Sequence, residues 1–564
     1  MENQKLDIRN PKFMGRRHSE FRLPTSDFMA PLAASVVVSE DASMKDRLPP
    51  GKVPWEIVAD LLSDELPAEV KLGPAAGEDA ALVEIGGELW AVASDPISFT
   101  SSDAGRLAVI VNANDVAVRG ARPQFFLAVG LIAPHEASKE RVAELLTQVR
   151  DTCREIGCTL IGGHTEISPG LPHTIVVGTM LGRVEGRPLT TGGLQEHDLV
   201  GMTRSAGLEG TSILLAKYGE QLSKVHGADA LTGSEGILSG EWLLVAREAL
   251  RVATCGGVTA LHDVTEGGVG EALHEMAVAS GLTIDAQRQA IPVLAETATI
   301  CGDLGIDPLG LIGSGSLLVG CDEASRTEVE TAFATEEVPF SWIGRAVAAE
   351  KAPGSRLPRF PRDELLKTGV LDGIRAVVFD MDGTLVDSTY DWPAIRQHLG
   401  VSGASIIDDL NGLEEPERSQ KWAELEEIER SATECAQLHD GAHEVLELFS
   451  VRGLTTALVT NNSSANTRRL LARFGLRFDV VLTRDSGLWK PSGAPIKEAV
   501  TQLGVTPAVC LGIGDSRYDV LAAREARLAA VCVVHDGAAR HDVDADLSFA
   551  DIPAFVRYLR IVLP

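Results

Sequence analysis

The stretch AVVFDMDGTLVD, residues 376–387, decides the fold of the last third of this chain. It begins with four apolar residues in a row, as in a strand that is buried on both faces of a parallel sheet. The run ends at Asp380 and Asp382. Ligands of open parallel sheets bind beyond the carboxyl ends of the strands, so both carboxylates are placed for chemistry. A polar turn after a core strand is the alternative, because Asp and Gly are ordinary turn residues.

Polar residues also follow the later apolar runs of this segment. The run TTALVT ends in Thr460, and Lys490 stands before a proline after the run FDVVLT. The stretch VCLGIGDSRYDV places Asp515 and Asp519 behind a third run. Because the ends of parallel strands meet at one edge of a sheet, we expect these groups to converge.

Each of these groups fits a role in phosphoryl chemistry. Asp380 is placed to attack phosphorus, and Asp382 to protonate the leaving oxygen and then activate water. Thr460 and Lys490 can hold the phosphoryl oxygens and neutralise their charge. The carboxylates predicted to hold Mg²⁺ are those of Asp380, Asp382, Asp515 and Asp519.

In this order, the motifs DMDGT, TNN, Lys-Pro and GDSRYD resemble the haloacid dehalogenase (HAD) superfamily, over residues 374–534. The resemblance is to its phosphoglycolate-phosphatase type and implies an α/β Rossmann-like domain with a small helical cap, at about 388–446. It implies Mg²⁺-dependent hydrolysis of a small phosphorylated metabolite through an aspartyl-phosphate. Asp382 favours a phosphatase over a dehalogenase, since phosphomonoester cleavage needs an acid for the leaving group.

The longer N-terminal part carries acids, amides and glycines beside predicted strands and helices. Polar residues on an otherwise buried helix need partners, and helix–helix hydrogen bonds are the alternative to a ligand site. A glycine pair after a strand lets the backbone approach a phosphate, although such pairs also form plain turns. The blocks are GEDAAL with Asp79, SDPIS with Asp95, NANDVAVRGARP with Asn114 and Asp115, GGHTEI with Gly162 and Gly163, and HDVTEGGVGEAL from His262.

Together these blocks resemble the AIR synthase superfamily over residues 72–347, and within it the AIR synthase-related, HypE-like proteins. The resemblance implies an α+β fold of two subdomains that forms a homodimer and binds ATP with Mg²⁺. It assigns Asp79, Asp95, Asn114 and Asp115 to the metal–nucleotide complex and brings Gly162 and Gly163 close to the phosphates.

The chain departs from this family at two points. His164 stands where an acidic residue usually follows the glycine pair, which leaves the ligand set open because Mg²⁺ prefers oxygen ligands. The modified C-terminal cysteine of HypE has no equivalent, so the carbamoyl-to-nitrile activity is not carried over.

Residues 351–362, KAPGSRLPRFPR, contain three prolines and no apolar periodicity, which is typical of a linker. With this boundary we predict five segments. The segments are a poorly ordered leader (1–50), an ATP-binding subdomain (51–187), a second AIR synthase-like subdomain (188–350), a linker (351–370) and a HAD-like hydrolase domain (371–564). Met44 is an alternative start.

Composition restricts the partners. The formal net charge of −29 argues against nucleic acid and anionic membranes as partners. No apolar run approaches the ~20 residues that cross a bilayer. The eight cysteines are scattered without zinc spacing, which is typical of a reducing compartment, and we expect a cytoplasmic protein. An arginine pair at 16–17 faintly resembles an export signal, but polar residues follow it.

Three hypotheses for function stay open. The first is a bifunctional enzyme, with an ATP-dependent half and a phosphatase domain that act on different intermediates. In the second, only the HAD domain is catalytic and the N-terminal half is a dimerising or nucleotide-sensing module. In the third, the HAD domain moves phosphate to an acceptor other than water.

Overall fold

The computed structural model describes Leu48 and residues 51–563, apart from residues 60, 63–64, 100–101, 228–240, 404 and 536–544. The predicted leader, apart from Leu48, and the alternative start at Met44 lie outside the described residues. A short helix, α1 (Trp55–Ala59), precedes the first sheet.

The first sheet has seven strands in the order β1-β2-β3-β7-β5-β6, with β4 beside β7. Its pairs are antiparallel except for β5 with β6. Strands β2 and β3 form a hairpin across the glycine pair 86–87, because they pair directly on either side of it. The strands are β1 (Val70–Leu72), β2 (Ala81–Ile85), β3 (Glu88–Ala93), β4 (Pro96–Ile97), β5 (Ala121–Ile132), β6 (Thr159–Ile167) and β7 (Ile175–Val184).

Two helices cover this sheet. Helix α2 (Ala104–Ala117) is buried along nearly its whole length and contacts both β7 and the helix α3 (Lys139–Ile156). Helix α3 is amphipathic and begins at Ser138, whose hydroxyl accepts a hydrogen bond from the backbone N–H of Arg141. Because α2 is buried, its polar residues must find partners inside the protein.

The second sheet has six strands in the order β13-β10-β12-β8-β11-β9. The helix α7 packs on it, and its glycine-rich start follows the motif HDVTEGG. The strands are β8 (Leu199–Thr203), β9 (Val258–Asp263), β10 (Leu282–Ala286), β11 (Leu317–Cys321), β12 (Phe340–Ala348) and β13 (Gly354–Ser355). The helices of this region are α4 (Leu208–His226), α6 (Ala246–Val252), α7 (Gly268–Ser280), α8 (Ala295–Leu304) and α9 (Arg326–Thr335).

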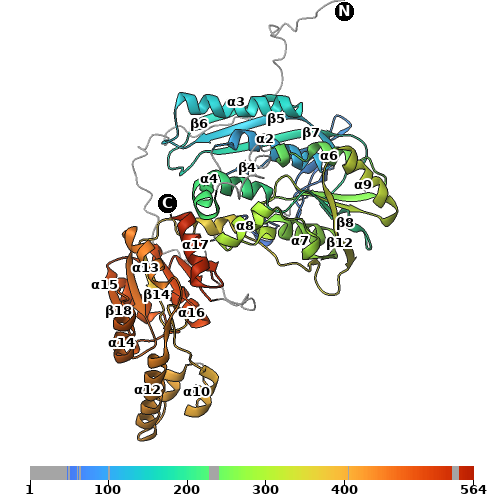
Figure 1. Ribbon diagram of the computed structural model, residues 1–564. Coiled ribbons are helices and arrows are strands. Elements are labelled where there is room, and N and C mark those ends of the chain that lie inside the picture. Colours follow the sequence, from blue (N-terminus) through green and yellow to red (C-terminus); the bar gives the residue numbers. More distant parts are fainter. Residues whose placement is uncertain are drawn as a thin grey trace, which may run out of the picture. The chain divides into compact units, whose positions relative to one another are not determined.

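The third sheet is parallel throughout, in the order β18-β17-β14-β19-β20-β21, and helices flank it (Figure 1). Strand β14 is buried on both faces: Val377 and Phe379 pack with α13, α14 and α17, whereas Ala376 and Val378 pack with α15 and α16. The strands are β14 (Ala376–Phe379), β17 (Thr455–Val459), β18 (Val480–Leu482), β19 (Cys510–Gly514), β20 (Ala530–Val533) and β21 (Leu547–Ser548). The helices are α13 (Ala442–Val451), α14 (Ser464–Phe474), α15 (Ala494–Leu503), α16 (Arg517–Glu525) and α17 (Ile552–Val562).

A helical cap is inserted between β14 and β17. Helices α10 and α12 contact each other and lie together in Figure 1. A two-stranded ribbon, β15 (Val386–Asp387) with β16 (Gln437–Leu438), forms its base, and α13 after it packs on the sheet. The cap helices are α10 (Trp392–Leu399), α11 (Ile406–Asn411) and α12 (Glu417–Cys435).

The segment predicted as a linker, 351–370, is packed against the N-terminal half. The backbone N–H of Phe360 donates to Glu271, and Asp363 accepts a hydrogen bond from the backbone of Gly267. Helix α17 in turn shares an apolar cluster with α4 and α8. The two halves therefore depend on each other for part of their packing.

Seven of the eight cysteines are buried and all are free thiols, so they pack as small apolar core residues. None of the helices in the described part of the chain combines the length and the apolar composition that crossing a bilayer requires.

Candidate active site

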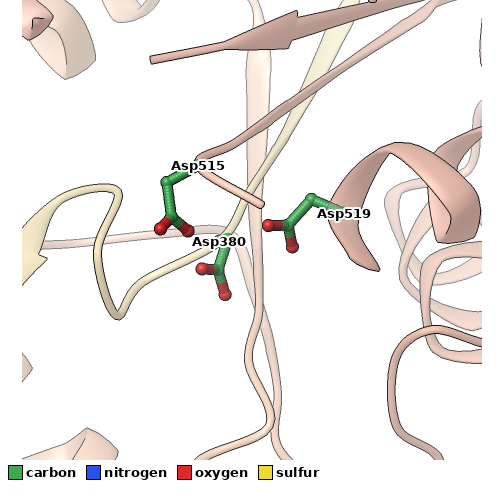
Figure 2. A group of neighbouring side chains, drawn as sticks. All are labelled: Asp380, Asp515 and Asp519. Atoms are coloured by element: carbon green, nitrogen blue, oxygen red, sulfur yellow. The ribbon is translucent and has the colours of Figure 1, made fainter. Parts of the chain in front are cut away.

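The predicted groups of the third sheet converge at the carboxyl edge of its parallel strands. Asp380 directly follows β14, Thr460 follows β17, and Asp515 follows β19. Figure 2 shows the carboxylates of Asp380, Asp515 and Asp519 directed toward a common space. Gly383 makes this approach possible, since its φ is +87° and a Cβ there would lie 2.4 Å from a carboxylate oxygen of Asp515.

Lys490 lies between two carboxylates in this space. Its ammonium group donates hydrogen bonds to Oδ1 of Asp380 and to Oδ1 of Asp519, and all three side chains are buried. Two hydrogen bonds of 2.8 Å between the Asn461 side chain and the backbone of Lys490 hold the lysine in place. Asp519 is fixed by the start of α16, where it accepts from the N–H and hydroxyl groups of Ser516.

Asp380, Asp515 and Asp519 form a group that fits a metal ion. One carboxylate oxygen of each lies within 4.8 Å of the others. Burial raises the pKa of Asp380 well above its usual value, and the charges of Asp519 and Asp515 act in the same direction against Lys490. A hard divalent cation would relieve this crowding of negative charge. Asp382, which we also predicted as a ligand, is not a member of the group.

Asp382 has a different environment. Its carboxylate accepts hydrogen bonds from Ser388 Oγ (2.6 Å), Asn462 Nδ2 (3.1 Å) and Thr460 Oγ1 (3.3 Å), all neutral donors. Removal from water raises the pKa of Asp382, although these hydrogen bonds oppose the rise. The two carboxyl groups that the motif DMD supplies thus differ: one lies beside a cation and two acids, the other among neutral groups.

A cavity of about 460 Å³ opens over these residues. Asp380, Asp382, Thr460 and Lys490 line its floor, and Asp515 and Asp519 line it as well. The cap supplies much of the remaining wall, with the side chains of Tyr390, Trp392, Pro393, Ile406, Ile407 and Leu425. The size is that of a pocket for a small organic molecule.

In the N-terminal half, Asp79 belongs to a buried ion-pair network. Its carboxylate accepts hydrogen bonds from Arg119 (3.0 Å) and from His262 Nδ1 (2.8 Å). Burial alone would raise the pKa of Asp79, but His262 and Arg119 lower it. Lys52 joins the same network through Glu275. Its Nζ lies 2.6 Å from Glu275, and Glu275 also contacts His262.

Asp95 and Asp115 lie near Asp79, together with Asp263 at the end of β9. Burial, with the charges of the neighbouring aspartates, raises the pKa of Asp95 and Asp115, and raises the pKa of Asp263 to about 8. Both carboxylate oxygens of Asp263 and one of Asp115 are buried without a hydrogen-bond partner. A cation is one partner that would satisfy such buried oxygens.

The other residues assigned to nucleotide binding make contacts that serve the packing of the fold. Asn114 donates to the backbone oxygen of Leu243 and accepts from the N–H of Val245, both at 2.9 Å, which corresponds to the helix-packing alternative. The glycine pair at 162–163, expected after a strand, lies within the exposed edge strand β6. A Cβ at Gly163 would lie 1.8 Å from the backbone oxygen of Ala128, so pairing with β5 already requires glycine there.

Several side chains at these sites were not assigned roles from the sequence. Asn462 could have been found from the motif TNN, which follows a strand, as could Asn461. His262 and Asp263 open the block HDVTEGGVGEAL, but the sequence alone assigns neither of them a role. No local sequence motif indicates the roles of Arg119 and Lys52, because their partners lie far away in the chain.

Three family models match the chain. The AIR synthase related protein N-terminal domain matches residues 77–184, and the AIR synthase related protein C-terminal domain matches residues 195–353. The haloacid dehalogenase-like hydrolase model matches residues 374–527.

Relatives match the two halves separately. Carbamoyl dehydratase HypE of Escherichia coli is 28% identical over 247 residues, 42% of this chain and 68% of that protein. An uncharacterized hydrolase of Saccharomyces cerevisiae is 30% identical over 165 residues, 28% of this chain and 75% of that protein. Phosphoglycolate phosphatase of Chromobacterium violaceum is 29% identical over 210 residues, 32% of this chain and 95% of that protein.

These matches confirm both resemblances and the fold class, an α+β AIR synthase-like half followed by an α/β Rossmann-like domain with a helical cap. The chain therefore carries the two AIR synthase related protein domains in its N-terminal half and a haloacid dehalogenase-like hydrolase domain in its C-terminal part.

Proposed function

We propose that the C-terminal domain hydrolyses a small phosphomonoester through a covalent phosphoryl group on Asp380. The observation that carries this proposal is the pair of carboxyl groups with different surroundings over one cavity. Asp380 lies beside Lys490 and the group of acids, whereas Asp382 accepts hydrogen bonds from neutral donors only. Two carboxyl groups whose environments differ in this way divide into nucleophile and acid.

In the first step, a carboxylate oxygen of Asp380 bonds to phosphorus and the bond from phosphorus to the leaving oxygen breaks. The bond electrons stay on the leaving oxygen, which takes the proton of Asp382. In the second step, Asp382 takes a proton from water as the water oxygen attacks phosphorus. The bond from phosphorus to Asp380 then breaks and inorganic phosphate leaves. Lys490 and Thr460 stabilise the charge on the phosphoryl oxygens.

The carboxylates of Asp380, Asp515 and Asp519 would hold Mg²⁺, since their oxygens already lie within reach of one ion. When bound, Mg²⁺ supplies positive charge that favours ionised Asp380 and offsets the charge of the substrate phosphate. Asp382 takes no part in this ligand set and stays available as the acid.

The experiment that tests this proposal is a phosphate-release assay on the full chain. We expect hydrolysis of para-nitrophenyl phosphate that needs Mg²⁺ and stops with EDTA. Asp380→Asn should lower kcat at least about 10³-fold, while Asp387→Asn, an exposed acid of the same segment, should change it little. Activity that survives in Asp380→Asn protein would refute the assignment of the nucleophile.

The N-terminal half would carry out a second, ATP-dependent reaction. The support is the buried cluster of Asp79, Asp95, Asp115 and Asp263, whose unpartnered oxygens suit a metal–nucleotide complex. The match to the AIR synthase related protein domains, a family in which ATP binding is expected, agrees with this role. If both halves acted on one phosphate group they would only hydrolyse ATP, so we propose that they act on different intermediates.

The alternative, that only the HAD domain is catalytic, has its own support. Asp79 is already neutralised by Arg119 and His262, and His164 pairs with Glu166 on the exposed strand β6. Calorimetric titration of ATP into wild-type and Asp115→Asn protein separates the two readings. Binding that the variant loses, together with turnover, supports an enzyme; binding without turnover of any acceptor supports a sensing module.

A further inference from the structure

The cavity over Asp380 is larger than a phosphoryl group requires. Its volume of about 460 Å³ compares with roughly 300–1,000 Å³ for pockets that hold small organic ligands. The phosphoryl group would occupy the floor, between Lys490 and Thr460. The leaving group must therefore fill the part of the cavity that faces the cap.

An aromatic pair stands in that part of the cavity. The rings of Tyr390 and Trp392 have centroids 4.6 Å apart, and both side chains line the cavity. The Tyr390 hydroxyl accepts a hydrogen bond of 3.3 Å from Asn462, which also donates to the proposed acid, Asp382. The pair is thus placed next to the leaving-group oxygen. Trp392 is 44% exposed, so its ring has surface available for a ligand.

The rest of the cap wall has an apolar part beside the polar side chains of Arg396, Ser405 and Glu429. Ile406, Ile407 and Leu425 line the cavity, and each of these side chains is buried. Apolar and aromatic surface of this kind binds apolar surface of a ligand and offers no hydrogen-bond donor to a carboxylate.

The cations around the cavity already have anionic or carbonyl partners. Arg484 donates to both carboxylate oxygens of Glu429, which is buried with it, and also to the backbone oxygen of Asn461. Lys490 is held by Asp380 and Asp519, and Arg396 donates to a backbone carbonyl. A carboxylate on the leaving group, as in phosphoglycolate, would compete with Glu429 for Arg484 and with Asp380 and Asp519 for Lys490.

We propose that the substrate is a phosphomonoester whose leaving group carries an uncharged planar ring close to the phosphate. The ring packs against Trp392 and Tyr390 while the phosphoryl group lies over Asp380. This inference rests on the proposed phosphatase function and names its substrate class. It sets this domain apart from the phosphoglycolate phosphatase that it resembles, whose named substrate has two carbons and a carboxylate.

The test compares three substrates on the full chain with Mg²⁺: benzyl phosphate, ethyl phosphate and phosphoglycolate. Benzyl and ethyl phosphate both release a primary alcohol, so their difference reports chiefly on the ring. We expect kcat/KM for benzyl phosphate to be at least about tenfold higher than for either other substrate. Trp392→Ala should lower kcat/KM for benzyl phosphate, chiefly by raising KM. The ratio of kcat/KM for benzyl phosphate to kcat/KM for ethyl phosphate should therefore fall. Trp242→Ala, a partly exposed tryptophan that does not line the cavity, is the control.

The possible results test the ring preference and the proposed phosphatase activity separately. Equal rates on the three substrates, or a preference for phosphoglycolate, would overturn the ring preference and leave the phosphatase intact. A lack of hydrolysis with every phosphomonoester would overturn both. If Trp392→Ala protein does not fold, competitive inhibition of the wild type decides: benzylphosphonate should inhibit more strongly than ethylphosphonate or phosphonoacetate, and equal inhibition contradicts the inference.

Discussion

The ammonium group of Lys490 donates a hydrogen bond to Asp380 inside the cavity, and both side chains are buried. The same ammonium group also donates to Asp519, so it links the proposed nucleophile to a second acid of the group. The lysine therefore offsets part of the charge of a buried group of acids. Its removal should affect stability as well as catalysis.

Lys490→Met should destabilise the protein, because it leaves two buried carboxylates without their counter-ion. The expected cost is about 3 kcal/mol in the absence of metal, as for one partner removed from a buried ion pair. Chemical denaturation in EDTA measures it, and Mg²⁺ should restore part of the loss. Lys497→Met, a half-exposed lysine of α15, should cost under about 1 kcal/mol. Equal losses for the two variants would contradict the account.

Asp382→Asn should discriminate between leaving groups. An alkoxide needs a proton as it leaves, whereas nitrophenolate is stable without one. The variant should therefore lose about 10²–10⁴-fold in kcat/KM for ethyl phosphate and much less for para-nitrophenyl phosphate. Steady-state kinetics with both substrates test this. The same loss on both would mean that Asp382 does not protonate the leaving group.

Protonation of His262 should stabilise the N-terminal half. Burial alone would lower its pKa, but the carboxylates of Asp79 and Glu275 raise it to about 10. Since the folded pKa lies above the unfolded value of about 6.5, the stabilisation is complete below pH 6.5 and is lost as the pH rises toward 10.

The measurement is the gap in Tm between wild type and His262→Gln, in the absence of nucleotide, at several pH values. The gap should be largest near pH 6 and shrink by pH 10. His197→Gln, with 76% of its side chain exposed, should show no such trend. A gap that stays constant over this range would show that His262 is not charged in the folded protein.

A homodimer should form through the edge strand β6. All its residues are exposed, among them Ile161 at 52%, and an unpaired edge of this kind favours association with a second chain. Light scattering after size exclusion should give a dimer mass for wild type and a monomer mass for Ile161→Lys. Ile85→Lys, equally exposed in the β2–β3 hairpin, should stay dimeric. A monomeric wild type would refute this proposal.

The C-terminal domain could be predicted largely from its sequence. Strands buried on both faces are short apolar runs, and β14, β17 and β19 follow the runs that end in Asp380, Thr460 and Asp515. The parallel topology then brings the residues after these strands together. The contacts of Asn462 with Asp382 could not be deduced, because they depend on side-chain directions in a loop.

The N-terminal half was harder to predict, because its contacts join distant segments. The strand β6 continues through Gly163 since the backbone of β5 lies against it, which the glycine pair does not reveal. Asn114 bonds to a backbone segment far along the chain, at Leu243. Polar residues on a buried helix predict that partners exist but not which ones.

The central claim is that the phosphoryl group is transferred to Asp380. Asp382→Asn should still be phosphorylated by para-nitrophenyl phosphate, because nitrophenolate leaves without a proton, yet lose phosphate slowly. After brief mixing with radiolabelled substrate and an acid quench, this variant should retain close to one label per chain, which hydroxylamine releases. The double variant with Asp380→Asn should retain none. Phosphate release without label on the Asp382→Asn chain, or label that persists in the double variant, would contradict the claim.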